Sequence, residues 1–372
     1  LLLVSPFVFG GEAMAAAVGA TTGPTGGTVV GGIGNITQNG ANTVINQNSA
    51  KLALDWQTFN VGKDASVKFN QPSFNAVALN RILDQNPSQI FGHISSNGQV
   101  FLINTHGIIF GASAQMNVGG LMASTLDLTP KDFLASRYNL DAHGANAGIV
   151  NHGLIKAASG GSVSLVGGSV ANDGVILANY GRINLDGADR AVLDFDGNGL
   201  INIQVTGELK QRLDNNQAAV TNKGTLKADS GTVVLQASAA KDLFTNLINN
   251  SGVIDAGGIS TQGGVVRLVA SGGDVQDSGA INVSGVQGGS VQLLSDRNVS
   301  VTGSIDASGR DGGGRIRLGG GYQGGEGLQA AAVTYVGPDA RLNADALESG
   351  DGGSVVLWSN TATGFKGNIS AR

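Results

Sequence analysis

Apolar and polar residues alternate in a short phrase that recurs between Asn151 and the end of the chain. The phrase reads NHGLIKA, NDGVILA, NKGTLKA, NSGVIDA, DSGAINV, VTGSIDA and FKGNISA. Its apolar positions form two columns: Ile155, Ile176, Leu226, Ile254, Ile281, Ile305 and Ile369, and then Ala157, Ala178, Ala228, Ala256, Val283, Ala307 and Ala371. Because side chains along a strand point alternately to opposite faces, this period of two predicts a strand with one buried face.

A second phrase, which begins at a glycine, alternates with the first and reads GSVSL, GRINL, GTVVL, GVVRL, GSVQL, GRIRL and GSVVL. Two strands therefore recur in each repeat. The repeat is 21 residues from Ala157 to Ala178 and 28 residues from Ala228 to Ala256. A period of this length, with turns rich in Gly and Asn, is typical of a solenoid whose coils bury their inward side chains against each other. We predict an all-β chain folded as a right-handed parallel β-helix, since the consensus of leucine-rich repeats is absent.

Some segments depart from the strand pattern. Solenoid ends need covering, so we expect an N-terminal cap over roughly residues 30–60. Thr129 followed by Pro130 predicts a short helix outside the coils, because Thr is a good N-cap and Pro suits the first helical position. KDLFTNLINN, from Lys241, is a second candidate helix.

Four asparagines precede the glycine of the first phrase by two residues. They are Asn151, Asn172, Asn222 and Asn250. Asn side chains can bond to turn backbone, so we interpret them as a structural stack at the coil corners.

The stretch GQVFLINTHGIIFG, residues 98–111, predicts a strand, a turn and a second strand. Its turn is Asn104-Thr105-His106-Gly107, where Asn and Gly tolerate positive φ. Both flanking runs are apolar at consecutive positions. We expect three side chains to point inward and three outward, namely Val100, Leu102 and Ile109 inward, and Phe101, Ile108 and Phe110 outward. Such an outward apolar patch predicts a cover, either an extra hairpin of this chain or a partner.

Composition narrows the function classes. The 372 residues include 60 Gly and no Cys, and the net charge of −5 gives no basic footprint for nucleic acid.

Residues 1–17 resemble the end of a secretory signal peptide, with Ala13-Met14-Ala15 as an A-x-A cleavage site, although an apolar edge strand is the alternative. The lack of Cys suits a chain that crosses a second membrane unfolded, and equally a β-fold that needs no disulfides.

Candidate chemistry is sparse. Polysaccharide-degrading enzymes are the alternative class for a β-helix, but they need clustered carboxylates, and here the outward positions mix Lys, Asp, Asn and Ser. The histidines lack metal-ligand spacing; they are His93, His106, His143 and His152. We therefore assign no catalytic, cofactor or metal residue.

A possible calcium loop begins at Asp194, with Asp196 and Asn198 at alternate positions. The twelfth position is Val205 where a calcium loop has a bidentate Glu. A hairpin turn between AVLDF and LINIQV accounts for the same residues, and we favour that interpretation.

Several motifs together resemble a known family. DWQTFNVG, FNQPS, LNRI, PSQIFG and GQVFLIN are similar to the secretion domain of filamentous haemagglutinin-type exoproteins of two-partner secretion in Gram-negative bacteria. The resemblance is close over roughly residues 30–130 and looser in the later coils. The family's usual Asn-Pro-Asn-Gly turn is replaced here by Asn104-Thr105-His106-Gly107. We accordingly divide the chain into residues 1–17 (signal remnant), 28–150 (secretion domain with its cap) and 151–372 (further coils).

The resemblance implies export to the periplasm, capture of the unfolded chain by the periplasmic POTRA modules of an outer-membrane pore, and folding outside as a β-helix. Strand addition to a sheet edge would suit such capture. Downstream regions of such exoproteins commonly carry adhesion, haemolysis or contact-dependent toxicity, and those regions would contact host or bacterial surface receptors. The candidate recognition residues are Phe101, Asn104, Gly107, Ile108 and Phe110.

Overall fold

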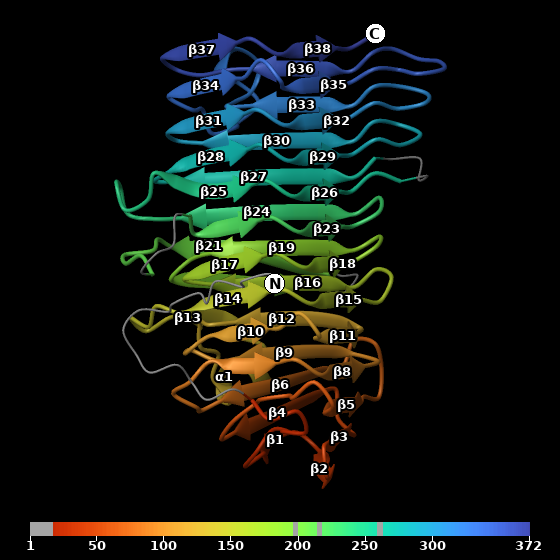
Figure 1. Ribbon diagram of the computed structural model, residues 1–372, viewed down its shortest axis with the longest axis vertical. Coiled ribbons are helices and arrows are strands. Elements are labelled where there is room, and N and C mark those ends of the chain that lie inside the picture. Colours follow the sequence, from red (N-terminus) through yellow and green to blue (C-terminus); the bar gives the residue numbers. More distant parts are fainter. Residues whose placement is uncertain (1–17, 196–199, 214–217, 259–262) are drawn as a thin grey trace, which may run out of the picture.

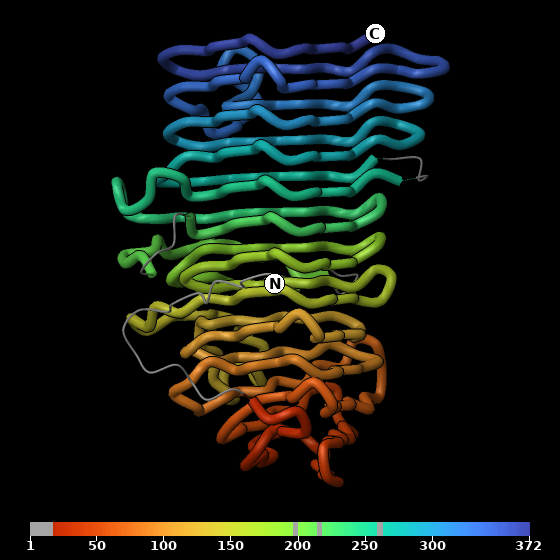
Figure 2. Tube along the Cα trace, viewed as in Figure 1, coloured from red at the N-terminus to blue at the C-terminus, as the bar shows by residue number. Residues whose placement is uncertain are grey.

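Three long sheets wind around one axis in the computed structural model, which describes residues 18–195, 200–213, 218–258 and 263–372. The predicted signal remnant and residues 196–199 of the possible calcium loop, which include Asp196 and Asn198, lie outside the described residues. Each regular coil contributes one strand to each sheet, and strands of successive coils pair in parallel, as Val163 does with Ile183. Figures 1 and 2 show the coils stacked into a column that ends at the C-terminus. The chain is a parallel β-helix, as the sequence predicts.

Sheet 1 consists, in spatial order, of β1 (Thr28–Gly31), β4 (Lys51–Trp56), β6 (Val77–Ile82), β9 (Gln99–Ile103), β12 (Gly120–Ser124), β16 (Ser162–Gly167), β19 (Arg182–Gly187), β24 (Thr232–Ser238), β27 (Val265–Ser271), β30 (Ser290–Ser295), β33 (Arg315–Leu318) and β36 (Ser354–Leu357). Sheet 2 consists of β7 (Ser88–Ile90), β10 (Ile108–Phe110), β14 (Gly148–Asn151), β17 (Ser169–Asn172), β22 (Val220–Asn222), β25 (Asn246–Asn250), β28 (Asp274–Asp277), β31 (Asn298–Val301), β34 (Val333–Val336) and β37 (Ala362–Phe365).

Sheet 3 consists of β2 (Gly34–Asn39), β3 (Asn42–Gln47), β5 (Ser66–Asn70), β8 (His93–Ser96), β11 (Gln115–Val118), β15 (Leu154–Ala157), β18 (Val175–Leu177), β23 (Thr225–Lys227), β26 (Val253–Asp255), β29 (Ala280–Asn282), β32 (Ser304–Asp306), β35 (Arg341–Asn343) and β38 (Asn368–Ser370). The first phrase forms the strands of sheet 3 and the second phrase those of sheet 1. The short strand of sheet 2 completes each coil, so a regular coil has three strands, of which the two recurring phrases supply two.

The predicted inward columns form the core of the solenoid. Ile155, Leu165 and Ile254 are fully buried in one continuous apolar cluster. In the last coil apolar and polar positions still alternate, but the apolar side chains are less buried, and Ile369 is 42% exposed. At the other end β1 pairs antiparallel with β4, and β2 antiparallel with β3, so the chain folds back over its first coil.

The four predicted asparagines form a ladder along the corner between sheets 2 and 3. Each fully buried side chain donates Nδ2–H to Oδ1 of the next coil, from Asn151 to Asn172, from Asn172 to Asn222 and from Asn222 to Asn250, at 2.8 Å each. The ladder ends at Asp277, whose Oδ1 accepts from Asn250 at 2.7 Å. Because buried amides are costly without partners, the ladder confirms the structural interpretation of the asparagines.

A glycine stands two residues after each asparagine of the ladder, because successive coils approach each other too closely there for any side chain. A Cβ at Gly174, Gly224 or Gly252 would collide with the carbonyl oxygen of the corresponding glycine one coil earlier. The same holds at the corner before sheet 1, where Gly161 meets Gly119 and Gly181 meets Gly161. The glycines of both recurring phrases are therefore steric requirements.

Insertions leave the solenoid at the corner between sheets 1 and 2. Between β12 and β14 lie α1 (Pro130–Leu134) and β13 (Asn139–Asp141); between β19 and β22 lies a hairpin of β20 (Arg190–Phe195) and β21 (Ile201–Gly207). β13, β20 and β21 pair as a small antiparallel sheet, here called the outer sheet. The loop between β33 and β34 contains a 3-10 turn, η1 (Tyr322–Gly324).

Two of the predicted irregular segments have different outcomes. The short helix is confirmed as α1, with the Thr129 hydroxyl accepting from the Asp132 amide at 3.1 Å. The second candidate helix is wrong, because β25 occupies its latter half. β25 contains a register shift, which allows the adjacent side chains of Leu247 and Ile248 both to be buried. The hairpin predicted after Asp194 is confirmed as β20 and β21.

The end of the asparagine ladder generates a prediction about pH. Burial raises the pKa of Asp277 to about 6, against the opposing hydrogen bonds from Asn250 and the Gly279 amide. Because the folded-state pKa exceeds the unfolded one, stability falls as pH rises from about 4 to about 6. We expect Asp277→Asn to remove this loss and to raise the unfolding free energy at neutral pH by up to about 3 kcal/mol.

Urea unfolding between about pH 4 and pH 8 measures this effect. The control is Asp339→Asn, a change at an exposed carboxylate. A pH dependence that is the same in the Asp277→Asn variant and in the unchanged chain would contradict the prediction.

Candidate recognition segment and its surroundings

The predicted turn links β9 to β10 and is held by the Asn104 side chain. Asn104 is fully buried; its Nδ2 donates to the Asn86 carbonyl at 3.1 Å and to Ser88 Oγ at 3.0 Å. Its Oδ1 accepts from the His106 amide at 2.9 Å. Gly107 has a φ of 117°, which L side chains rarely adopt. Asn104 and Gly107 thus set the backbone geometry, as predicted, while the His106 side chain is exposed.

Phe101 points away from the solenoid core, as predicted, and is fully covered by its own chain. Its ring lies 6.1 Å from that of Phe133 in α1 and 6.3 Å, nearly parallel, from that of Phe195 in β20. It belongs to a second apolar core between the outward face of sheet 1 and the outer sheet with α1. This core accounts for the apolar residues on both faces of β9, and the predicted cover is intramolecular.

The expectation for β10 was wrong by one residue. Ile108 and Phe110 point into the solenoid core and are fully buried, whereas Ile109 is half-buried on the outward side. Phe110 aligns with Asn151, so it occupies the corner column that the asparagine ladder fills later. Even-numbered residues point inward in β9 (Val100, Leu102) and again in β10 (Ile108, Phe110), so the alternation continues through the turn unchanged, whereas the expectation had exchanged the two faces of β10.

Polar contacts hold α1 over sheet 1. The Lys51 ammonium donates to the Phe133 carbonyl at 2.9 Å and to Ser136 Oγ at 2.6 Å. Arg81 of β6 forms a bidentate ion pair with Asp127, both bonds 2.8 Å, just before the helix. The hydrogen bond from Arg81 to Asp127 is the main reason that the pKa of Arg81 is raised.

Polar contacts also join the hairpin of the outer sheet to sheet 1. The Ile201 amide donates to Ser162 Oγ and its carbonyl accepts from Asn184 Nδ2, both at 3.1 Å. Arg182 donates to Asn202 Oδ1 at 2.9 Å. These contacts lie near the start of β21, and β20 is held in addition by its antiparallel pairing with β13.

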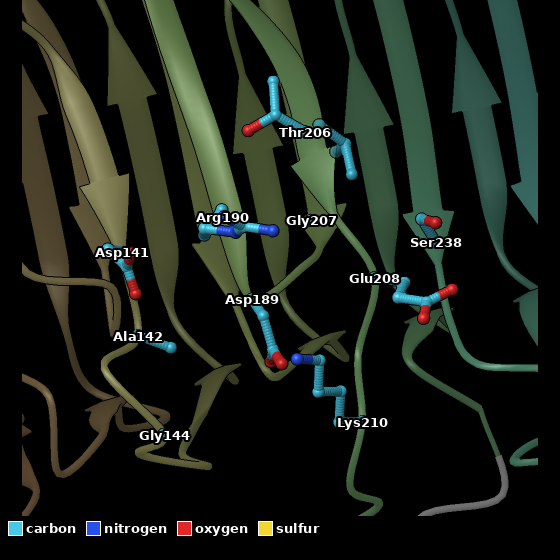
Figure 3. A pocket seen from close by; sticks show the side chains of 11 residues that line it. Asp141, Ala142, Gly144, Asp189, Arg190, Thr206, Gly207, Glu208, Lys210 and Ser238 are labelled. Carbon is cyan, nitrogen blue, oxygen red and sulfur yellow. The ribbon is translucent and has the colours of Figure 1, made fainter.

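An open pocket of about 710 Å³ lies at the base of this hairpin. Asp141, Asp189, Arg190, Glu208 and Lys210 contribute charged groups, and the Lys210 ammonium points toward the Asp189 carboxylate (Figure 3). Desolvation raises the pKa of Asp189, against the amide and charge of Lys210. The sequence did not reveal this pocket, because its residues come from insertions outside the repeats.

Two further observations concern metals and membranes. In the part of the chain that the structure describes, no three His, Cys, Asp or Glu side chains gather as a metal site would need. Neither α1 nor any other described helix has the length and apolar character to cross a membrane.

Comparison with known proteins identifies the family. The model of the TPS (two-partner secretion) secretion domain matches residues 20–283, well over half of the chain. The chain belongs to the TPS secretion-domain family. The crystal structure of the HMW1 secretion domain from Haemophilus influenzae is 32% identical, with a TM-score of 0.83 over 94% of this chain and 91% of that one.

Longer relatives extend the comparison. Two heme/hemopexin-binding proteins, one from Haemophilus influenzae and one from its strain Rd, are 28% and 32% identical over 65% and 70% of this TPS chain. The matches span 27% and 28% of those relatives' lengths. The TPS chain therefore corresponds to about a quarter of each longer exoprotein.

The turn of this TPS domain generates a test of stability. We expect Asn104→Ala to lower the unfolding free energy by about 2–3 kcal/mol, because it leaves buried partners unpaired. His106→Ala, at an exposed side chain, should change it by less than about 0.5 kcal/mol. Gly107→Val should also destabilise the fold, because Val does not tolerate this φ. Urea midpoints of the three variants provide the measurement, and equal midpoints would show that the turn makes no such demand.

Proposed function

We propose that this TPS domain is captured in the periplasm, while unfolded, by the POTRA modules of its outer-membrane pore, and that residues 98–111 take part in that recognition. TPS domains direct export of their exoproteins across the outer membrane of Gram-negative bacteria by a dedicated transporter. The observation that carries the proposal is that Phe101, Asn104, Ile108 and Phe110 are all at most 1% exposed in the folded chain. A transporter can reach these side chains only before folding is complete.

Burial changes how the proposal must be tested. Replacing Phe101 or Phe110 with Asp would disrupt normal packing as well as any recognition, because a buried charge without a partner is strongly destabilising. A control must therefore share the folding defect. Leu293 and Val301 are equally buried but lie beyond residue 283, where the match to the family model ends.

We expect the double variant Phe101→Asp/Phe110→Asp to reduce export severalfold more than Leu293→Asp/Val301→Asp. Each variant is co-expressed with the cognate pore, and its periplasmic and extracellular amounts are compared. Equal loss in both double variants would assign the effect to folding alone and would remove residues 98–111 from recognition.

We also propose that the chain has no enzymatic activity of its own, in keeping with a family defined as a secretion domain. The mixed-charge pocket at Asp189 is the place where the polysaccharide-degrading alternative would have to act. Incubation of the folded chain with pectin, alginate and other acidic polysaccharides should release no reducing or unsaturated ends. Product that disappears in Asp189→Asn or Glu208→Gln, but persists in Asp194→Asn, would establish the enzyme instead.

The activity of the complete exoprotein is a separate matter. The two longer relatives are named for binding heme and hemopexin. We propose that contacts with surface receptors or ligands reside mainly in regions outside the TPS domain, which supplies export and an initial stretch of solenoid.

A further inference from the structure

A buried carboxyl without a partner lies next to the second apolar core. Asp186 is on the outward side of β19, where Leu185 points into the solenoid core, and it is fully buried. Neither of its carboxylate oxygens has a hydrogen-bond partner among the described residues. Its cross-strand neighbours are Val166 of β16 and Gln236 of β24. Asp186 thus differs from Asp277, which accepts a hydrogen bond from the asparagine ladder.

The hairpin of the outer sheet packs over this part of sheet 1. β21 contacts both β19 and β24. Its inward positions carry Ile201, Ile203 and Val205, and those of β20 carry Ala191 and Leu193.

Among the described residues, charged groups lie near both ends of the hairpin. Arg182, which donates a hydrogen bond to Asn202, lies at one end of β19. The open pocket lies at the other end, and its charged residues are Asp141, Asp189, Arg190, Glu208 and Lys210. On the covering strands Asp194 is exposed. Desolvation by burial raises the pKa of the Asp186 carboxyl well above its usual range.

We propose that the β20–β21 hairpin is a lid that opens and closes over the outward face of β16 and β19, with the Asp186 carboxyl beneath it setting the balance. The closed lid accommodates a neutral carboxyl. An ionised carboxyl requires a polar partner, and the described residues of the closed hairpin supply none. Raising the pH therefore favours an open lid, which hydrates Asp186 and exposes Val166.

The chain lacks cysteine, so single cysteines can report on the lid. Val163 and Val166 are matched positions, since both are fully buried on β16, but Val163 points into the solenoid core and Val166 into the second core. Thiol labelling of Val166→Cys and Val163→Cys is measured at about pH 6 and about pH 8.5. Both rates are divided by that of Asp339→Cys, an exposed reference that corrects for thiol ionisation.

We expect the corrected labelling rate of Val166→Cys to rise roughly tenfold or more over this range, a tenfold change corresponding to one pKa unit. Val163→Cys should label slowly at both pH values. Adding Asp186→Asn, which preserves the shape of the side chain, should abolish the rise. Labelling of Val166→Cys no faster than that of Val163→Cys, or a rise that survives Asp186→Asn, would overturn the proposal.

Hydrogen exchange of the unsubstituted chain provides a measurement without cysteine variants. After correction for the intrinsic effect of pH, peptides from 190–195 and 201–207 should lose protection as pH rises, while those from 162–167 keep their protection. Unchanged protection of the hairpin across the pH range would likewise overturn the proposal.

Discussion

Successive coils of the solenoid are one strand spacing apart, and this distance is the constraint on which the remaining features depend. At two corners it brings a glycine against the carbonyl oxygen of the glycine one coil earlier, as at Gly174 and Gly181. At the corner between sheets 2 and 3 the same spacing lets each asparagine amide reach the next at 2.8 Å. A shift of one residue in a coil between Asn151 and Asn250 would break both relationships, so in these coils glycine and asparagine together fix the register.

The outer sheet and α1 add contacts that a simple solenoid lacks. In a repeat array each unit contacts only its neighbours, and stability is roughly a sum of local terms. The second core instead joins Ala53 of β4, Phe101 of β9 and Ile203 of β21 in one cluster. The first coils are therefore tied directly to residues about 150 positions later in the chain, whereas the later coils depend on their immediate neighbours.

Local periodicity made most of the solenoid predictable. The columns of Ile155 and Leu165 follow from a period of two, and the N-cap at Thr129 and the turn at Asn104 follow from the chemistry of single residues. The faces of β10 could not be assigned from the sequence, because a turn can either keep or exchange the faces of the strand that follows it. Here the turn keeps them, and Ile108 and Phe110 point inward like Leu102. The outer sheet was out of reach because β13 pairs with β20 across some fifty intervening residues, a contact that no periodicity reports. Asp186 resembled any other outward polar residue until its cover was known.

Insertions that begin after a strand of sheet 1 and end before a strand of sheet 2 leave the parallel pairing of their coils intact. β19 and β24 remain in register from Arg182 to Gly187 although the hairpin separates them in sequence. The entropic cost of lengthening a loop grows only slowly with its length. This corner is therefore where the solenoid can take on additional surface elements at little cost, whereas at the glycine corners the close approach of successive coils leaves no room for them.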